Sequence, residues 1–308
     1  MQFEIFGSSH LEEAQALAQK AYSAACHQFP ALPQSVSLPS FAPLCNGLGI
    51  AAVEKGKLMG FLAAEDPIFR MFGTMENGVF SPVHAHGLSP DAPEGLMQRL
   101  YQHCGALWQK AGALWHAVCL YENETAAARG LIRYGFGQRC ADAVRTVLPL
   151  DIPPLPGIEY KEVTPGAEDL EEMHIGLWKH LLQSPCFLSG PDEAMHWWLS
   201  TLKTRPIRVF AAYMQGKPVA YMEVRSDGEN FITHIPGMMN ICGAYCDPAF
   251  RGTGISPALL SFVLDKLQKE GITHLGVDYE TMNPTAAGFW EKHFTPYTQS
   301  LVKHLDTL

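Results

Sequence analysis

Two stretches of the chain resemble each other at a separation of about half its length. The segment "QKAGALWHAVCLYENETAA", which begins at Gln109, is similar to "QKEGITHLGVDYETMNPTAA", which begins at Gln268. Gly112 and Gly271 in these segments are 159 positions apart. A period this long indicates two copies of a whole domain rather than a solenoid of short repeats. We therefore expect two homologous domains in tandem.

The order of expected elements repeats in the same way. Each half opens with a strand and with a helix whose apolar residues recur at helical spacing. Two strands joined by a tight turn follow, with Lys55-Gly56 as the turn in the first half and Gln215-Gly216-Lys217-Pro218 in the second. After them each half shows a strand, a long helix, a strand, a shorter helix and a final strand. This alternation predicts an α/β fold for both copies.

A proline-rich segment separates the two halves. The stretch "LPLDIPPLPGIEY", residues 148–160, contains four prolines and a glycine and has the composition of a linker. We expect an N-terminal domain over residues 1–150, a linker over 151–157 and a second domain over 158–308.

Composition excludes several functional classes. Of the 308 residues, 47% are hydrophobic and 17% are charged, which is typical of a folded protein. The formal net charge of −9 argues against a nucleic-acid surface, which needs clustered Lys and Arg. The N-terminus has no signal-peptide pattern, no run reaches the ~20 apolar residues that cross a bilayer, and the eight cysteines are scattered. A soluble, cytoplasmic and reduced protein without a membrane or nucleic-acid partner is expected.

The segment "CDPAFRGTGISPALL" predicts an anion-binding loop. It places Gly252 and Gly254 between a short apolar strand and an apolar helical pattern. A helix N-terminus presents unpaired backbone N–H groups and the positive end of the helix dipole, which suit a phosphate or diphosphate. Glycines allow a tight turn and a close approach of the anion. Arg251 either adds positive charge for that anion or braces the loop.

Two common phosphate loops do not fit this segment. A Walker A loop needs Gly-Lys-Ser/Thr, whereas Gly254 is followed by Ile255 and Ser256. A dinucleotide fingerprint needs a third glycine near position 257, where the chain has Pro257. That fingerprint also belongs to the first strand–helix unit of its domain, whereas this loop comes late in the second half of the chain.

A third loop fits better. Arg251 to Ser256 resembles the Gln/Arg-x-x-Gly-x-Gly/Ala loop of the GCN5-related N-acetyltransferases (the GNAT family), except that Ser256 replaces the last Gly or Ala. The family's Asn-x-x-Ala-x-x-Phe-aromatic segment is matched by Asn283, Ala286, Phe289 and Trp290. The resemblance covers roughly residues 158–308. It implies two tandem GNAT-like domains, each with a mixed, mostly antiparallel central sheet flanked by helices.

The resemblance also implies a ligand and its site. Acetyl-CoA would place its diphosphate on the amides of residues 252–256 and its pantetheine arm beside the strand that ends at Tyr245 and Cys246. Asn283 would hydrogen-bond that arm, and Trp290 would pack against it or close the pocket. The residues expected to bind acetyl-CoA are Tyr245, Cys246, Arg251, Gly252, Thr253, Gly254, Ile255, Ser256, Asn283 and Trp290.

Catalysis by direct attack needs a neutral amine. An alkylamine is almost wholly protonated near pH 7, so a base or a water relay is useful. Glu223 is the first candidate base and Glu280 the second, and each could instead be a solvated carboxylate at a strand end. A backbone N–H near Tyr245 could polarise the thioester carbonyl. Many members of the family carry, at the position of Trp290, a tyrosine that protonates the leaving thiolate. Here either Tyr245, Tyr279 or Tyr297 would take over that role, or no acid is needed.

The first copy departs from this pattern. Its corresponding segment, "SPVHAHGLSPDAPEGLM", lacks the arginine and the close pair of glycines, so we expect a degenerate, non-catalytic N-terminal domain. No metal site is expected, because the spacing of Cys242, Cys246 and His234 matches no standard zinc site.

The resemblance implies an N-acetyltransferase that transfers acetyl from acetyl-CoA to the primary amine of a small molecule or peptide. The alternative is a non-catalytic, CoA-binding regulatory protein, which Trp290 favours. Transfer of another acyl group stays open, and the chain is expected to be a monomer or a homodimer.

Overall fold

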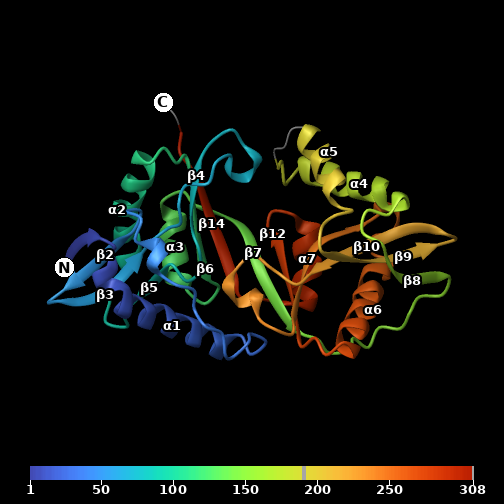
Figure 1. Ribbon diagram of the computed structural model, residues 1–308, viewed down its shortest axis with the longest axis horizontal. Coiled ribbons are helices and arrows are strands. Elements are labelled where there is room, and N and C mark those ends of the chain that lie inside the picture. The colour runs from blue at the N-terminus through green and yellow to red at the C-terminus, as the bar shows by residue number, and fades with distance from the viewer. Residues whose placement is uncertain (189–191, 307–308) are drawn as a thin grey trace. The chain divides into compact units, whose positions relative to one another are not determined.

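The computed structural model describes residues 1–188 and 192–306. The chain divides into two compact units, whose elements are labelled in Figure 1. Unit 1 consists of residues 1–143, of 279–287 and of the chain from Thr295 onward. Unit 2 consists of residues 144–278 and 288–294. The boundaries 1–150 and 158–308 stay a prediction about where the two sequence copies begin and end.

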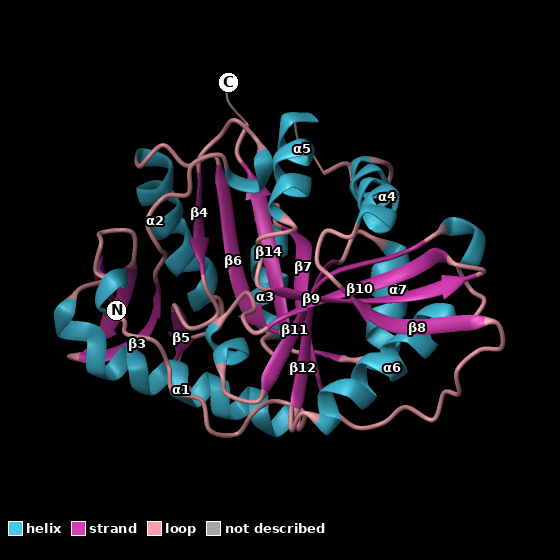
Figure 2. Cartoon of the chain, turned by 45° about the vertical axis from the view of Figure 1, so that its right-hand side comes forward, coloured by secondary structure: helices cyan, strands magenta, loops and turns pink. Residues whose placement is uncertain are grey.

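Unit 1 contains two groups of paired strands. Strands β1, β2, β3 and β5 form one sheet in that order, with antiparallel neighbours. In the other group β4 runs parallel to β6, and β14 lies antiparallel between β6 and β7. Helices α1 and α2 lie on opposite sides of the first sheet (Figures 1 and 2). The elements are β1 (Gln2–Ile5), α1 (Leu11–Gln28), β2 (Ile50–Glu54), β3 (Lys57–Leu62), β4 (Gly78–Ser81), β5 (His86–Leu88), α2 (Leu96–Lys110), β6 (Trp115–Tyr121), α3 (Thr125–Arg133), β7 (Gly137–Thr146, to Ala143 in this unit), β13 (Thr295–Pro296) and β14 (Thr298–His304).

The last long strand of the chain completes the sheet of unit 1. Strand β14 pairs along its length with β6, with Thr298 opposite Tyr121 and His304 opposite Trp115. Leu301 of this strand is fully buried in the same apolar core as Leu100 and Trp108 of α2. The end of the sequence therefore stabilises its beginning.

Unit 2 has one mixed sheet in the order β8-β9-β10-β11-β12. The first three pairings are antiparallel, and β11 pairs with β12 in parallel. Helices α4 and α5 cover one face and α6 covers the other (Figure 1). The elements are β8 (Ile158–Val163), α4 (Glu171–Leu182), α5 (Asp192–Thr201), β9 (Ile207–Met214), β10 (Lys217–Arg225), β11 (Met238–Cys246), α6 (Ile255–Lys269), β12 (His274–Glu280, to Asp278 in this unit) and α7 (Pro284–His293, from Gly288 in this unit).

Both predicted hairpins are confirmed, and the second turn is shorter than expected, because Lys217 and Pro218 already belong to β10. Lys55 and Gly56 have φ angles of 51° and 75°, and Gln215 and Gly216 have φ angles of 50° and 78°. Positive φ at both central residues is the signature of the two-residue turn that matches the twist of antiparallel strands. The order of elements repeats in outline, but the first half has two strands, β4 and β5, before its long helix, and the second half has an additional helix, α5. Each unit is a mixed α/β structure.

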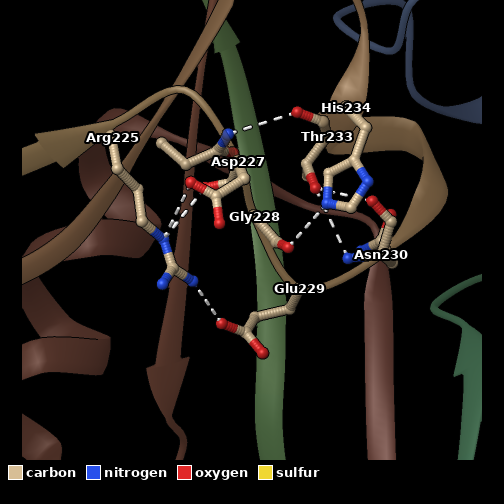
Figure 3. A network of polar contacts seen from close by, with 8 residues as sticks. Arg225, Asp227, Gly228, Glu229, Asn230, Thr233 and His234 are labelled. Atoms are coloured by element: carbon tan, nitrogen blue, oxygen red, sulfur yellow. Dashed lines mark hydrogen bonds and ion pairs between the residues drawn. The ribbon is translucent and has the colours of Figure 1, made fainter. Parts of the chain in front are cut away.

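Polar contacts within the connection order the chain between β10 and β11 (Figure 3). Arg225 Nε donates to the carbonyl of Asp227 at 3.0 Å, and its Nη2 contacts Glu229 Oε1 at 2.6 Å. His234 Nε2 lies 2.9 Å from the carbonyl oxygen of Gly228. Because both ends of the loop are held by its own residues, β11 enters the sheet in a defined position.

Candidate active site

Strands β11 and β12 part in the middle of unit 2. Their parallel pairing runs over Met238–Ile241 and His274–Val277. Beyond it β11 continues with β10 alone as far as Cys246, among the residues that the structure describes. The register of β10 and β11 shifts at Cys242, because Gly243 lies opposite Glu223 and Ile241 opposite Val224. This bulge turns β11 away from β12 and leaves one side of its main chain available for an extended ligand.

Glu223 lies next to the point where the strands part. Its side chain is 2% exposed, and its Oε1 is 2.8 Å from Nε2 of His174 on α4. Its Oε2 lies over Gly243, where a Cβ would come within 2.7 Å of that oxygen. The expectation of a possible solvated strand-end carboxylate is wrong for Glu223, because this carboxylate is buried, paired and directed at the backbone of β11.

Tyr245 occupies the outer part of the same strand segment. It lies opposite Tyr221 of β10 and beneath helix α4, where a Cβ on Gly176 would approach its hydroxyl oxygen to 2.8 Å. Burial raises the pKa of Tyr245 above its ordinary value, and the Arg251 guanidinium partly opposes that rise. The phenol therefore keeps its proton at neutral pH.

Arg251 braces the loop. Its Nε donates to the carbonyl of Cys246 at 3.1 Å, and its guanidinium carbon is 5.5 Å from the centroid of the Tyr245 ring. Of the two expected roles, the structure shows this one. Burial raises the pKa of the Cys246 thiol, a hydrogen bond from Ser256 opposes the rise, and a neutral strand cysteine results.

The glycine loop ends in a helix N-terminus with free donors. Gly252 and Gly254 have φ angles of 76° and 90°, which glycine adopts without strain, and α6 begins directly after Gly254. In the described chain the N–H groups of Gly252, Gly254, Ile255 and Ser256 have no acceptor. Thr253 differs, because its N–H and its hydroxyl both donate to the carbonyl of Phe250, at 3.4 and 2.6 Å. Four of the five expected amides are thus available to an anion.

Three other expected residues have defined packing roles. Glu280 and Asn283 belong to unit 1. Glu280 pairs with Arg139 at 3.5 Å, and burial raises the pKa of this carboxyl while Arg139 lowers it. Asn283 Oδ1 accepts from the hydroxyl of Thr285 at 2.7 Å and caps the start of α7. Trp290, in unit 2, is buried edge-on against neighbouring phenylalanine rings.

The first copy lacks the corresponding constellation. Counting from the matched hairpin turns, Ala63 of unit 1 takes the place of Glu223, and its N–H bonds to the carbonyl of Ala85. In the loop before α2, Pro93 has no N–H, and the N–H of Leu96 donates to the carbonyl of Pro93 at 3.2 Å. The smaller number of free donors supports the prediction of a degenerate copy.

No group of three or more His, Cys, Asp or Glu side chains in the described chain is arranged to hold a metal ion. None of the eight cysteines, all of which lie in the described ranges, forms a disulfide. No helix in the described ranges combines the length and hydropathy needed to span a bilayer.

Sequence reasoning did not identify His174, Gly176 or Gly243. Each matters through a residue that is distant in sequence, and no motif marks such a pair. An alignment of the two copies contains a signal for Gly176, because a large residue and a glycine change places between them. Gly176 corresponds to Leu17 of the first copy, and Tyr245 corresponds to Gly87. A Cβ on Gly87 would meet Leu17 at 2.8 Å, so each copy pairs one large side chain with one glycine.

Comparison with known proteins supports the relationship that these features suggest. Residues 170–294 match the model of the acetyltransferase (GNAT) family. No curated protein sequence matches the chain.

Among solved structures, a GCN5-related N-acetyltransferase from Sphaerobacter thermophilus is 17% identical, with a TM-score of 0.57 over 99% of this chain and 96% of its own. A tandem GNAT protein from the clavulanic acid biosynthesis pathway is 13% identical, with a TM-score of 0.50 over 100% of this chain and 99% of its own. A functionally unknown conserved protein from Staphylococcus epidermidis ATCC 12228 is 8% identical, with a TM-score of 0.51 over 83% of this chain and 94% of its own. The chain therefore shares its fold with the first two of these structures over nearly its whole length, and its residues 170–294 match the acetyltransferase (GNAT) family.

Proposed function

We propose that the protein is an N-acetyltransferase that moves the acetyl group of acetyl-CoA to a primary amine by direct attack in a ternary complex. One observation carries the proposal: the free N–H groups of Gly252, Gly254, Ile255 and Ser256 follow the end of a strand, β11, that has parted from its parallel neighbour. A diphosphate fits the donors, and an extended amide-bearing arm fits the open side of the strand. Acetyl-CoA supplies the activated acyl group.

The residues of unit 2 account for the proton transfers. Glu223 Oε2 lies at the backbone of Gly243 and is the base that removes a proton from the amine. A backbone N–H near Tyr245 stabilises the negative charge that develops on the thioester oxygen. The phenol of Tyr245, which is protonated at neutral pH and has the Arg251 guanidinium beside it to oppose the rise of its pKa, is the donor to the leaving thiolate. Glu280 lies in unit 1 and is paired with Arg139, so Glu223 is the stronger candidate.

The buried carboxylate also favours an enzyme over a CoA-binding regulator. A purely binding role gives no reason to keep an acidic group inside an apolar core, where burial is costly unless the group is paired. The free donors of the loop predict CoA binding in either case. Activity is therefore the measurement that separates the two functions.

The test is turnover. The chain is incubated with acetyl-CoA and a panel of small-molecule and peptide amines, and products are identified by mass spectrometry while free thiol is measured. We expect an amine-dependent release of CoA with a mass gain of one acetyl group on the acceptor. Tight acetyl-CoA binding without transfer to any amine would replace the proposal with the regulatory function. The acceptor class is read directly from the panel.

A further inference from the structure

A buried histidine of α4 contacts Glu223 and also lines a pocket in unit 2. His174 Nε2 is 2.8 Å from Glu223 Oε1, and the two side chains are 1% and 2% exposed. The pocket has a volume of about 240 Å³, and Glu171, His196 and Lys203 contribute charged or polar groups to its wall. A polar pocket of this size has room for several water molecules.

The Tyr221 phenol and the Cys242 thiol near the pair stay protonated at neutral pH. The ring of Tyr221 is 4.5 Å from that of His174, and burial raises the pKa of Tyr221 well above its ordinary value. Burial likewise raises the pKa of Cys242 to about 12. The titratable groups around the pair and its pocket are Tyr221 and Glu223 of β10, Cys242 and Tyr245 of β11, Glu171 of α4, and Glu168, His196 and Lys203 around the pocket.

The two copies of the domain differ at both members of the pair. Leu11-Glu12-Glu13 of the first copy matches Leu170-Glu171-Glu172 of the second, which places Gln15 at the position of His174. Glu223 corresponds to Ala63. The imidazole and the carboxylate therefore occur together in the copy with the anion-binding loop, and neither occurs in the other.

We propose that His174 is a proton-relay residue, which passes to the pocket the proton that Glu223 removes from the acceptor amine. This inference rests on the proposed function. An alkylammonium ion and a thioester give an amide, a thiol and one proton: the C–N bond forms, the C–S bond breaks, and the nitrogen loses two protons. One reaches the sulfur and the other must leave the protein. Glu223 and His174 are both buried, and of the two only His174 lines the pocket, so the imidazole stands between the carboxylate and this polar space.

The variant that tests the relay is His174→Gln. The side-chain amide of Gln can donate to Glu223 as imidazole Nε2 does, so the buried carboxylate keeps a partner, but an amide does not carry a proton. We expect unchanged acetyl-CoA affinity and a kcat reduced about tenfold or more, in line with the usual size of acid–base effects. The matched control is His180→Ala on the same helix, for which kcat should stay at the wild-type value.

Chemical rescue gives a second readout that a structural role would not move. In His174→Ala the void joins the pocket, and added imidazole should restore kcat in a saturable manner that grows as pH increases the neutral imidazole fraction. Wild-type kcat in His174→Gln across the pH range, or His174→Ala that imidazole does not rescue, would overturn the relay alone. A wild-type chain that transfers acetyl to no amine would overturn the proposed function, and the relay with it.

Discussion

At the scale of single residues, the absence of a side chain at Gly243 positions the proposed base. A Cβ at this position would lie 2.7 Å from Glu223 Oε2 and 3.3 Å from its carboxyl carbon. The φ angle of Gly243 is outside the left-handed region, so alanine fits the backbone there. Steric contact, rather than backbone strain, would therefore decide the effect of a substitution.

We predict that Gly243→Ala lowers kcat roughly tenfold to a hundredfold, because a displacement of about 1 Å at a reacting group costs rate on this scale. The dissociation constant of acetyl-CoA should change little, since the loop donors are untouched. Steady-state kinetics and calorimetric titration measure the two quantities. Gly137→Ala is the control, because a Cβ on that strand glycine meets nothing within 4 Å. Equal kcat for both variants would remove Glu223 from the proposed mechanism.

A second residue-scale effect concerns stability and pH. His116 of β6 is 1% exposed, and its Nδ1 is 2.9 Å from the hydroxyl of Tyr101. Burial lowers the pKa of His116 from 6.5 to about 4. Between these values the unfolded chain binds a proton at this position that the native chain does not, so acidification favours unfolding.

The expected result is that the free energy of unfolding falls by up to about 1.4 kcal/mol per pH unit from this group as pH drops from 6.5 to 4. His116→Asn should reduce that slope, because it removes the titrating ring and keeps a polar partner for Tyr101. Urea unfolding at several pH values provides the measurement. The exposed His27, changed to Asn in the same way, should leave the slope as it is in the wild type. A slope unchanged in His116→Asn would contradict the assignment.

At the scale of elements, helix α6 carries the proposed anion site at its N-terminus. Thr253 is exposed, directly precedes the capping Gly254, and has its own amide bonded to Phe250. A carboxylate at this position would favour the helix through its dipole and would repel a bound diphosphate. A carboxylate at position 253 should therefore weaken ligand binding without destabilising the fold, so the two effects can be measured separately.

For Thr253→Glu we expect acetyl-CoA to bind about tenfold or more weakly, because a like charge a few ångström from the diphosphate costs on the order of 1–4 kcal/mol. The melting temperature should stay level or rise. Thr253→Gln, which has the same shape without the charge, should bind almost as the wild type does. Added salt should narrow the difference between the two variants. If Thr253→Glu and Thr253→Gln bind acetyl-CoA with equal affinity at low salt, the diphosphate does not lie at the N-terminus of α6.

Local patterns in the sequence predicted the elements, but not the contacts between distant ones. Both hairpin turns and the start of α6 follow from glycine and proline positions, which act within a few residues. The contact between His174 and Glu223 depends on how α4 packs across β10, and periodicity does not determine that angle. The segment "TQSLVKH" reads as a strand, yet nothing in its residues names β6 as its partner. Tertiary packing supplies that information.

At the scale of the whole molecule, the position of β14 between β6 and β7 makes the stability of unit 1 depend on residues 298–304. Leu301 is fully buried in the core that contains Leu100 and Trp108 of α2, about 200 residues earlier in the sequence. Without β14, the facing edges of β6 and β7 would lose their hydrogen-bond partners. The first 150 residues alone should therefore aggregate, and a peptide of residues 295–308 added in trans should reduce that aggregation.

A graded version of this test keeps the chain intact. Leu301→Ala should lower the stability of unit 1 by about 2–5 kcal/mol through the cavity that it creates. Hydrogen exchange should then accelerate in α2 and β6, while α6 of unit 2 keeps more of its protection. Val302→Ala, at a half-buried position on the same strand, should have a smaller effect. Faster exchange in α6 with α2 unchanged would show that β14 belongs to the fold of unit 2, because the cavity would then lie beside α6.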